Sequence, residues 1–543
     1  MSLPQRMPNH TPTRLSRRRF LGLGSRADAS GATPPAGPDA VSHPSGQRWT
    51  AHQSADMPPP DPVVHLLNRA AFGAAPQDLA QARAMGVEAW VDAQLNFEAI
   101  DDSAVEGPLA AGLPSLAMSL NDLSQLDQHT YRVTDALNAA TFYRQAFSPR
   151  QLYEVMVDFW TDHFSIYQLM ENAEVFKSVD DREVIRKHAL GRFKDLLTAS
   201  AHSPAMLRYL NNDENTKDHP NENYAREIME LHTLGVAVNG VPYTEADVLE
   251  VARCFTGWTW NRTWNDPVYG TFLFVPDRHD RGVKHVLGTL VPAQGGQQDG
   301  LTVIDRLCDH PATARFLALK LVRRFVADDP LASAPALVDR VADAYTRTDG
   351  DIKAMVREVL VSPELAGAFG RHGGKLTRPM DVAVRMMRAA GVPQAAIVPR
   401  LGDHAYPFQA WYFELVGYQG FMRRMGHIPF GWLTPDGYPD VKEPWASAVG
   451  MLSRWNMALA LATGGLVPGF RPHEYRPREL ASPEAVVDHW IDALLHRPML
   501  PEDREVVLAF YSGGGAGGPA TPPALREAQT VALVLASPYF QWR

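Results

Sequence analysis

Apolar side chains recur at spacings of three and four residues through most of the chain from residue 63 onward, and this periodicity constrains the fold more than any other feature. Such spacing places the apolar side chains on one face of a helix. It predicts helices over residues 63–72, 76–95, 150–164, 173–197, 222–234, 245–256, 311–326, 337–345, 352–361, 378–390, 444–462, 485–495 and 524–535.

Strand signals are few. Residues 272–275 and 286–288 are short apolar runs that predict a small hairpin around a polar insert. The glycine-rich stretches 295–300 and 512–523 are typical of flexible loops. The sequence therefore predicts a mainly α fold, an irregular multi-helix domain with at most a small β-hairpin.

Residues 1–62 differ in composition from the rest of the chain. They are basic near the start and then rich in Pro, Ser, Gly and Ala, which predicts a disordered leader. Residues 16–21, Ser-Arg-Arg-Arg-Phe-Leu, match a twin-arginine export signal, although the apolar segment that should follow is short. We expect a periplasmic or extracellular protein, with a cytoplasmic one as the alternative. Residues 63–543 are expected to form a single large helical domain, which the sequence allows to subdivide near residues 370–400.

Composition excludes several classes of protein. With 543 residues, 45% of them hydrophobic, the chain can bury a large core. Its net charge of −9, with arginines scattered among acids, argues against nucleic acid as a partner. No apolar run approaches the length of about eighteen residues that a transmembrane helix needs. Cys254 and Cys308 have no zinc or redox spacing and cannot make a disulfide framework.

The helix expected near residues 221–235 carries an unusual concentration of polar side chains. Asn223, Arg226, Glu227 and Glu230 fall on one stripe, opposite an apolar face that includes His232. Arg226 and Glu230 are four residues apart, so an ion pair along a solvated helix face explains part of the pattern without any function.

The next helix repeats the arrangement, and a polar loop follows it. Thr244 opens that helix with a capping-box pattern, and Asp247, Glu250 and Arg253 share one side of it. The loop 277–285 adds His279, Asp280 and Lys284, residue types that bind ligands on loops or simply lie in a solvated turn.

Paired carboxylates are the groups that general acid and base catalysis uses. Glu227, Glu230, Asp247 and Glu250 are therefore the candidate catalytic residues. Asn223, Arg226, Arg253, His279, Asp280 and Lys284 are the candidate substrate-binding residues. A divalent metal is compatible with such a site, but its ligands would have to come from separate elements, because His232 lies opposite the acids of its own helix.

Two further patterns are weaker. Glu154, Asp158 and Asp162 form one row on their helix, with His163 in the inward row beside it, where a histidine is more often a core residue than a ligand. Residues 431–445 form an aromatic and proline-rich stretch that either lines a pocket or packs on itself. Phosphate-binding glycine loops, dinucleotide fingerprints, zinc-protease motifs and nucleophile elbows are missing from the sequence.

In order, these segments resemble the bacterial family catalogued as domain of unknown function 1800. The resemblance covers nearly everything from residue 60 to the carboxy terminus and rests on six stretches: residues 65–73, Phe159-Trp160 with His163-Phe164, residues 206–212, the Asn221-Glu222-Asn223 helix through Gly235, residues 243–248 and Phe255-Thr256-Gly257-Trp258. It implies a mostly helical fold and frequent twin-arginine export. It also implies frequent genetic pairing with a second exported family, domain of unknown function 1501, which resembles the alkaline phosphatase and sulfatase fold.

Two functions fit the sequence. The first is an exported enzyme that acts on a cell-envelope or extracellular polymer through a carboxylate-rich site. The second is a non-catalytic companion or binding protein, working with a partner of the family 1501, in which the same charged residues form a structural ion-pair network. Two arginines against four or more carboxylates do not balance, which favours the first reading slightly.

Overall fold

The computed structural model describes residues 57–126, 129–170, 173–235, 243–264, 266–368, 374–397, 420–467 and 469–543. The twin-arginine-like signal and most of the expected leader lie outside these residues. Residues Gln53–Arg543 form one unit by their internal contacts. The described part is mainly helical with two short strand pairs, which confirms the predicted fold class. No described helix is both long and apolar enough to cross a membrane.

Most of the first half is helical. Its helices are α1 (Pro62–Ala70), α2 (Pro76–Met85), α3 (Val87–Leu95), α4 (Ser103–Gly112), α5 (Leu120–Ser124), α6 (His129–Phe147), α7 (Gln151–His163), α8 (Ala173–Asp180), a π-helical turn (Asp181–Arg186), α9 (Phe193–His202), α10 (Pro204–Tyr209), α11 (Glu222–Glu230) and α12 (Glu245–Cys254).

The strands follow α12, and helices resume after them. The strands are β1 (Trp258–Trp260), β2 (Phe272–Phe274), β3 (Lys284–Val286) and β4 (Thr289–Val291). The later helices are α13 (Gln297–Asp309), α14 (Pro311–Phe325), α15 (Pro330–Ser333), α16 (Pro335–Arg347), α17 (Ile352–Leu360), α18 (Pro363–Ala366), α20 (Pro379–Ala389), α22 (Ala448–Ala462), α23 (Pro483–Leu495), α24 (Pro501–Ser512), α25 (Pro523–Ala536) and α26 (Pro538–Gln541).

Local sequence sets where many helices begin. Asp61 caps α1 by accepting hydrogen bonds from the amides of Val63 and Val64, and proline occupies the first helical position. The predicted capping box of α12 is present: Thr244 and Asp247 exchange side-chain to backbone hydrogen bonds. These caps satisfy amides that no helical carbonyl can reach.

The predicted pairing of the strands is wrong. Residues 272–275 and 286–288 do not pair with each other. Instead β2 pairs with β1, with Thr259 opposite Leu273, and β3 forms a tight hairpin with β4, with His285 opposite Leu290. The turn between β3 and β4 passes through Leu287 and Gly288, both with positive φ, which sets the register of a two-residue hairpin.

Three further predictions need correction. The helix expected over residues 76–95 is two helices, α2 and α3, divided at Gly86, which has a positive φ. The helix expected over residues 173–197 is interrupted, because the amide of Phe193 donates to the carbonyl of Gly350 and that of Ile352 donates to Gly191. This long-range pairing pulls the chain out of helical geometry before α9. The expected loop 295–300 is instead largely the first turn of α13.

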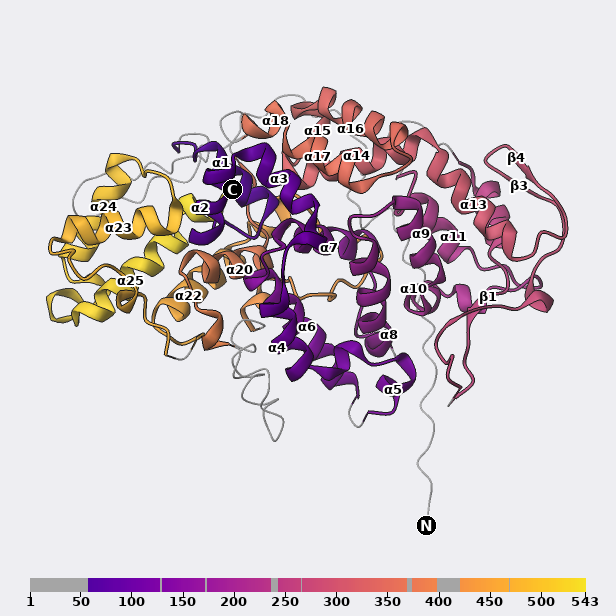
Figure 1. The fold of residues 1–543 in the computed structure, drawn as a ribbon, viewed down its shortest axis with the longest axis horizontal. Helices are drawn as coiled ribbons and strands as arrows, with labels where there is room; N and C mark the ends of the chain where they lie inside the picture. Colours follow the sequence, from indigo (N-terminus) through magenta and orange to yellow (C-terminus); the bar gives the residue numbers. More distant parts are fainter. Residues whose placement is uncertain are drawn as a thin grey trace, which may run out of the picture. The chain divides into compact units, whose positions relative to one another are not determined.

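Most buried apolar side chains form one core, which includes the fully buried Trp90, Trp160 and Trp258. Smaller separate clusters lie between α4 and α6 and around Leu376, Tyr438 and Trp445. Figure 1 shows α14, α15, α16 and α17 grouped together, α9, α11 and α13 near the strand pairs, and α23, α24 and α25 in a further group. Helix α9 contacts α13, and the groove described below lies between these two helices.

Candidate functional site

The predicted residues of α11 form ion pairs near the surface. Arg226 donates to Glu222 at 3.2 Å along the helix and to Glu245 at 2.7 Å, which belongs to the first turn of α12. Glu227 is 1% exposed, whereas Glu230 is partly exposed. The asparagine of the stripe, Asn223, donates its side-chain amide to a backbone carbonyl of α10's end at 3.2 Å.

The predicted residues of α12 connect it to the β3–β4 hairpin. Arg253 donates to Glu250 at 2.6 Å and to Asp280 at 2.8 Å, and its guanidinium lowers the pKa of Asp280. Glu250 also accepts the amide of His285 at 2.7 Å, and Asp247 accepts that of a hairpin-turn residue at 2.9 Å. These carboxylates therefore fix the hairpin against α12.

His279 and Lys284 lie deeper and reach the first turn of α13. Lys284 donates to Asp299 at 2.6 Å, and the Nε2 atom of His279 lies 3.1 Å from the same carboxylate. All three side chains are buried. The predicted binding residues thus belong to networks that join α11, α12, the hairpin and α13.

The structure does not gather the four predicted acids around one of the cavities described below. Their catalytic role stays a prediction. Within the described ranges, no three His, Cys, Asp or Glu side chains stand close enough together to hold a metal ion.

The acid row of α7 lies in a larger network. Arg378, on the residue before α20, bridges Asp158 and Asp162, with 2.6 Å to Asp162. Arg324 donates to Asp158 at 2.8 Å, and Arg378 also approaches Asp381 at 3.3 Å. Because each acid has an arginine partner, this network ties α7 to α14 and α20 through compensated buried charge.

A small cavity adjoins the same row of acids. Its volume is about 20 Å³, and it is lined by Glu154, Asp158, Asp162, Asp181, Gln145 and His427, among others. That is room for about one water molecule. Burial raises the pKa of Asp162 to about 6, against the attraction of Arg378. The side-chain carbonyl of Gln145 is buried and accepts no hydrogen bond from the described residues.

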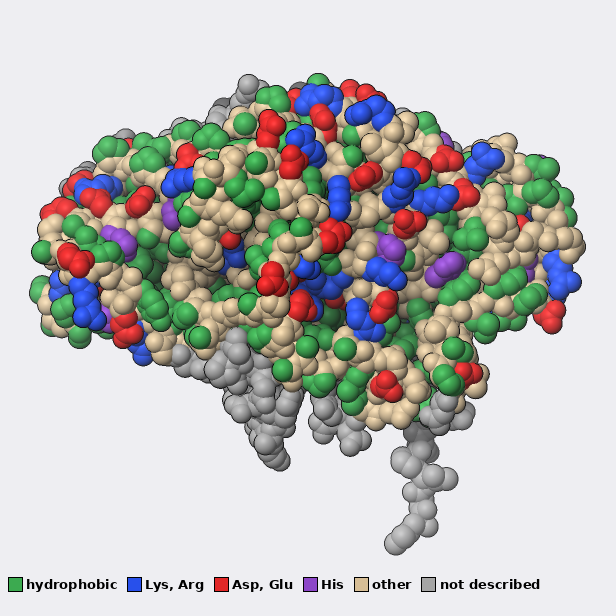
Figure 2. Space-filling model, viewed as in Figure 1, with side chains coloured by type: hydrophobic (Ala, Val, Ile, Leu, Met, Phe, Trp, Pro, Cys, Tyr) green, Lys and Arg blue, Asp and Glu red, His purple; other side chains and the backbone are tan. Residues whose placement is uncertain are grey.

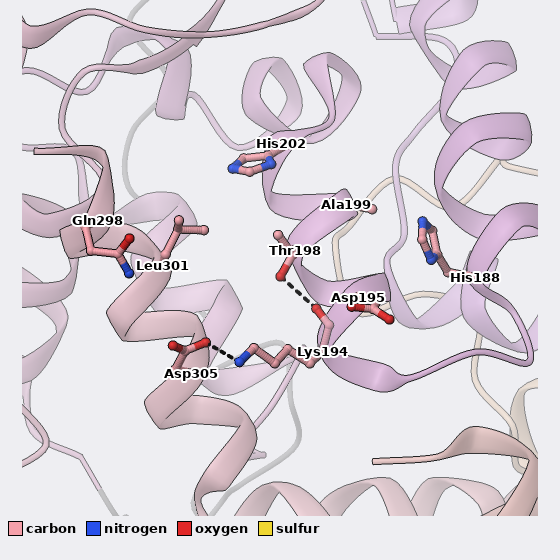
Figure 3. Close-up of a pocket in the computed structure, with 9 residues that line it drawn as sticks. All are labelled: His188, Lys194, Asp195, Thr198, Ala199, His202, Gln298, Leu301 and Asp305. Atoms are coloured by element: carbon pink, nitrogen blue, oxygen red, sulfur yellow. Dashed lines mark hydrogen bonds and ion pairs between the residues drawn. The ribbon is translucent and has the colours of Figure 1, made fainter. Parts of the chain in front are cut away.

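A much larger groove lies between α9 and α13. Its volume is about 500 Å³, and Figure 3 shows side chains of α13 facing those of α9 across it. The lining residues are His188, before α9, then Lys194, Asp195, Thr198, Ala199 and His202 of α9, and Gln298, Leu301 and Asp305 of α13. This volume is within the usual range for small-molecule sites.

The groove carries little net charge. Lys194 and Asp305 form an ion pair of 2.7 Å across it, with about half of each side chain exposed. Burial lowers the pKa of His202 to about 4 and also lowers that of His188, so both imidazoles are neutral at pH 7. The groove therefore holds one lysine and two carboxylates, of which Asp305 pairs with the lysine and Asp195 is exposed. On the face drawn in Figure 2, acidic and basic side chains are interspersed around the histidines over α9.

The β1–β2 pair shapes one end of the groove. The ring of His202 lies 4.8 Å from that of Trp258 and 4.0 Å from that of Phe272, measured between centroids. Trp258 also packs against Gly300 of α13, where a Cβ atom would lie 2.4 Å from the indole. His202 Nε2 is buried and has no hydrogen-bond partner among the described residues.

Sequence reasoning did not identify this groove. His188 and His202 have no recognisable motif spacing, and α13 was not predicted: the sequence indicated a loop over residues 295–300 and no helix between that loop and residue 311. The available signal was indirect: the apolar spacing of residues 303, 304, 307 and 308 is helical and follows directly after Gly300.

Comparisons with known proteins identify a family but no activity. Neither the curated proteins nor the solved structures include a match to this chain. A family model described as "Protein of unknown function (DUF1800)" matches residues 65–542, which is most of the chain. The chain therefore belongs to the DUF1800 family, as the resemblance of its sequence stretches implied.

Proposed function

We propose that this chain is an exported glycan-binding protein, and that the α9–α13 groove holds a segment of an uncharged, hydroxyl-rich polymer of the cell envelope or its surroundings. The observation that carries the proposal is the groove itself, about 500 Å³ in volume and lined mainly by polar side chains. In this proposal the charged residues of α11 and α12 form a structural ion-pair network, as in the second of the two functions that fit the sequence.

The chemistry of the lining favours hydroxyl groups over ions. Neutral imidazoles and the Gln298 amide offer both donors and acceptors, as a sugar requires, and the Thr198 hydroxyl, which donates to the carbonyl of Lys194, adds an acceptor. Lys194 is already paired with Asp305. The remaining carboxylate, Asp195, repels anionic polymers, whereas Leu301 and Ala199 supply apolar surface for a sugar face.

Titration calorimetry with two tetrasaccharides tests this proposal. We expect an uncharged glucose tetrasaccharide to bind the full chain and a uronic acid tetrasaccharide to bind more weakly. Leu301→Trp fills the groove and should weaken binding at least about tenfold. Leu249→Trp, at an exposed site of α12, is the matched control and should leave affinity unchanged. Equal binding by the Leu301→Trp variant would refute the groove as the site.

A second candidate function is acid–base catalysis at the α7 cavity. The pKa of Asp162 is raised to about 6, so its carboxyl group can exchange a proton near neutral pH. It lines the small cavity, which has room for one water molecule. Release of labelled fragments from cell-envelope glycan should then fall about 100-fold in Asp162→Asn. The exposed Asp339→Asn is the control. Full activity of Asp162→Asn would rule out Asp162 as the catalytic group. The candidates would then be the acids predicted from the sequence, Glu227, Glu230, Asp247 and Glu250.

The cellular setting of this function is part of the same proposal. Twin-arginine export would deliver the folded chain to the compartment where envelope polymers lie. A protein of the family 1501 would act there as its partner. Fractionation of cells expressing the full chain, with Arg17 and Arg18 both changed to Lys as the comparison, tests the export step.

A further inference from the structure

A second cavity lies on the other side of the end of α9. Its volume is about 190 Å³. Apolar side chains supply most of its wall: Leu120, Phe176, Val179, Val184, Ala199 and Pro204. We call this cavity the slot.

Apart from His202, the polar side chains that line the slot already have partners. Asp180 accepts hydrogen bonds from Lys177 at 2.7 Å and from Ser203 at 2.7 Å, and all three side chains are buried. Glu183 lies at the rim, where Arg182 pairs with it at 2.8 Å. A ligand in the slot therefore meets satisfied polar atoms and apolar surface, which favours a hydrocarbon group.

The slot and the groove meet at two residues of α9. Ala199 and His202 line both cavities. His202 lies at this junction, and its Nε2 is buried without a hydrogen-bond partner among the described residues. A turn of the ring would bring this atom to a ligand amide or hydroxyl, which would supply the missing hydrogen bond.

We propose that the glycan bound in the groove carries a short acyl group, and that this acyl group enters the slot past His202 and Ala199. The inference rests on the proposed function of the groove and names the class of its ligand: an acylated sugar rather than a plain polyhydroxyl chain. The sugar ring occupies the polar groove, the carbonyl or amide lies at His202, and the hydrocarbon fills the apolar slot.

Hydrocarbon burial gives this inference a measurable signature. Each methylene buried contributes about 0.8 kcal/mol, which is about fourfold in affinity. Affinity should therefore rise about fourfold per methylene along a series of acyl chains and become constant once the slot is full. A ligand held by the groove alone shows no such dependence.

The experiment uses the full chain and N-acylglucosamines with acetyl, butanoyl, hexanoyl and octanoyl groups, which are all uncharged. Affinities are measured by calorimetry beside those of the plain glucose tetrasaccharide. Val179→Phe fills the slot and should abolish the rise with chain length while binding of the tetrasaccharide persists. Val506→Phe, at an exposed site of α24, is the matched control. Val179→Ala enlarges the slot, so affinity should become constant at a longer acyl chain than in wild type. A folding defect would not produce this shift.

The outcomes separate the two proposals. If the tetrasaccharide binds but the acyl series is flat, or if its rise survives in Val179→Phe, the acyl inference is overturned and the groove stands. If the series rises and depends on Val179 while the tetrasaccharide fails to bind, the slot stands and the proposed function fails. If wild-type chain binds neither probe, both proposals fail.

Discussion

The indole of Trp258 lies so close to Gly300 that a Cβ atom on this glycine would stand 2.4 Å from the ring. Gly300 belongs to the first turns of α13, and Trp258 is fully buried in β1. The absence of a side chain at Gly300 thus sets how α13 approaches the strands, and with it the width of the groove.

Gly300→Ala should destabilise the protein. Alanine improves helix propensity by about 1 kcal/mol, but overpacking against the indole costs about 1–3 kcal/mol. We expect a net loss in the free energy of unfolding, measured by denaturant titration, and weaker glycan binding. Gly107→Ala in α4 is the control, because nothing except its chain neighbours lies within 4 Å of its added Cβ atom; Pro108 follows it, so we expect a smaller loss than at Gly300 rather than a gain. A stabilised Gly300→Ala variant would contradict the packing account.

The network of Arg378 should be essential for stability. Its guanidinium is 3% exposed and pairs with Asp158, Asp162 and Asp381. Arg378→Gln leaves buried carboxylates without their cation, which typically costs about 3–5 kcal/mol. Arg315→Gln removes a pair with Asp339 in which both side chains are at least half exposed, and should cost at most about 1 kcal/mol. Equal losses in the two variants, compared by thermal and urea unfolding, would disprove a special role for Arg378.

Buried His232 should make stability depend on pH. Burial lowers the pKa of His232 to about 3, and both ring nitrogens lack hydrogen-bond partners among the described residues. The unfolded chain binds a proton at this site below about pH 6.5, whereas the folded chain does not until about pH 3. The stability contributed by neutral His232 is therefore full above pH 6.5 and is lost progressively as pH falls.

His232→Leu removes this dependence. We take the unfolding free energy of the variant minus that of wild type. As pH is lowered from 6 to 4, this difference should rise by about 1.4 kcal/mol per pH unit, and above pH 7 it should stay constant. Urea titrations at several pH values measure it. A difference that does not change with pH would show that His232 titrates alike in the folded and unfolded states.

Local patterns predicted most of the helices because apolar periodicity and caps are properties of neighbouring residues. They failed where a distant segment decides the outcome. Residues 191–193 leave helical geometry because they pair with residues 350–352. Gly300, expected in a loop, lies in α13, where the indole of Trp258 occupies the space that a side chain would take. Of the strands, only β2 was located correctly: residues 286–288 overlap β3 at Val286 alone, β1 and β4 were not predicted, and the pairing was wrong, since short strands carry little register information.

In the candidate site, too, the sequence predicted contacts within a helix better than contacts between distant segments. The charge pattern correctly placed Arg253 on the same side of its helix as Glu250, with which it pairs, but the pair predicted along α11 is wrong: Arg226 pairs with Glu222 rather than with Glu230. It could not show the partners supplied from elsewhere, Glu245 for Arg226 and Asp280 for Arg253. The groove is formed by two helices that are far apart in the sequence. The spacing of residues within either helix therefore does not predict it. Cavities of this kind follow from tertiary packing rather than from local sequence.

Hydrogen–deuterium exchange of the full chain, with and without an uncharged tetrasaccharide, tests the central claim most directly because it locates the ligand. The account predicts slower exchange in peptides from α9 and α13, residues Phe193–His202 and Gln297–Asp309, and little change elsewhere. Protection confined to other segments, such as α7 with its row of acids, or binding without protection of either groove helix, would contradict the assignment of the groove as the glycan site.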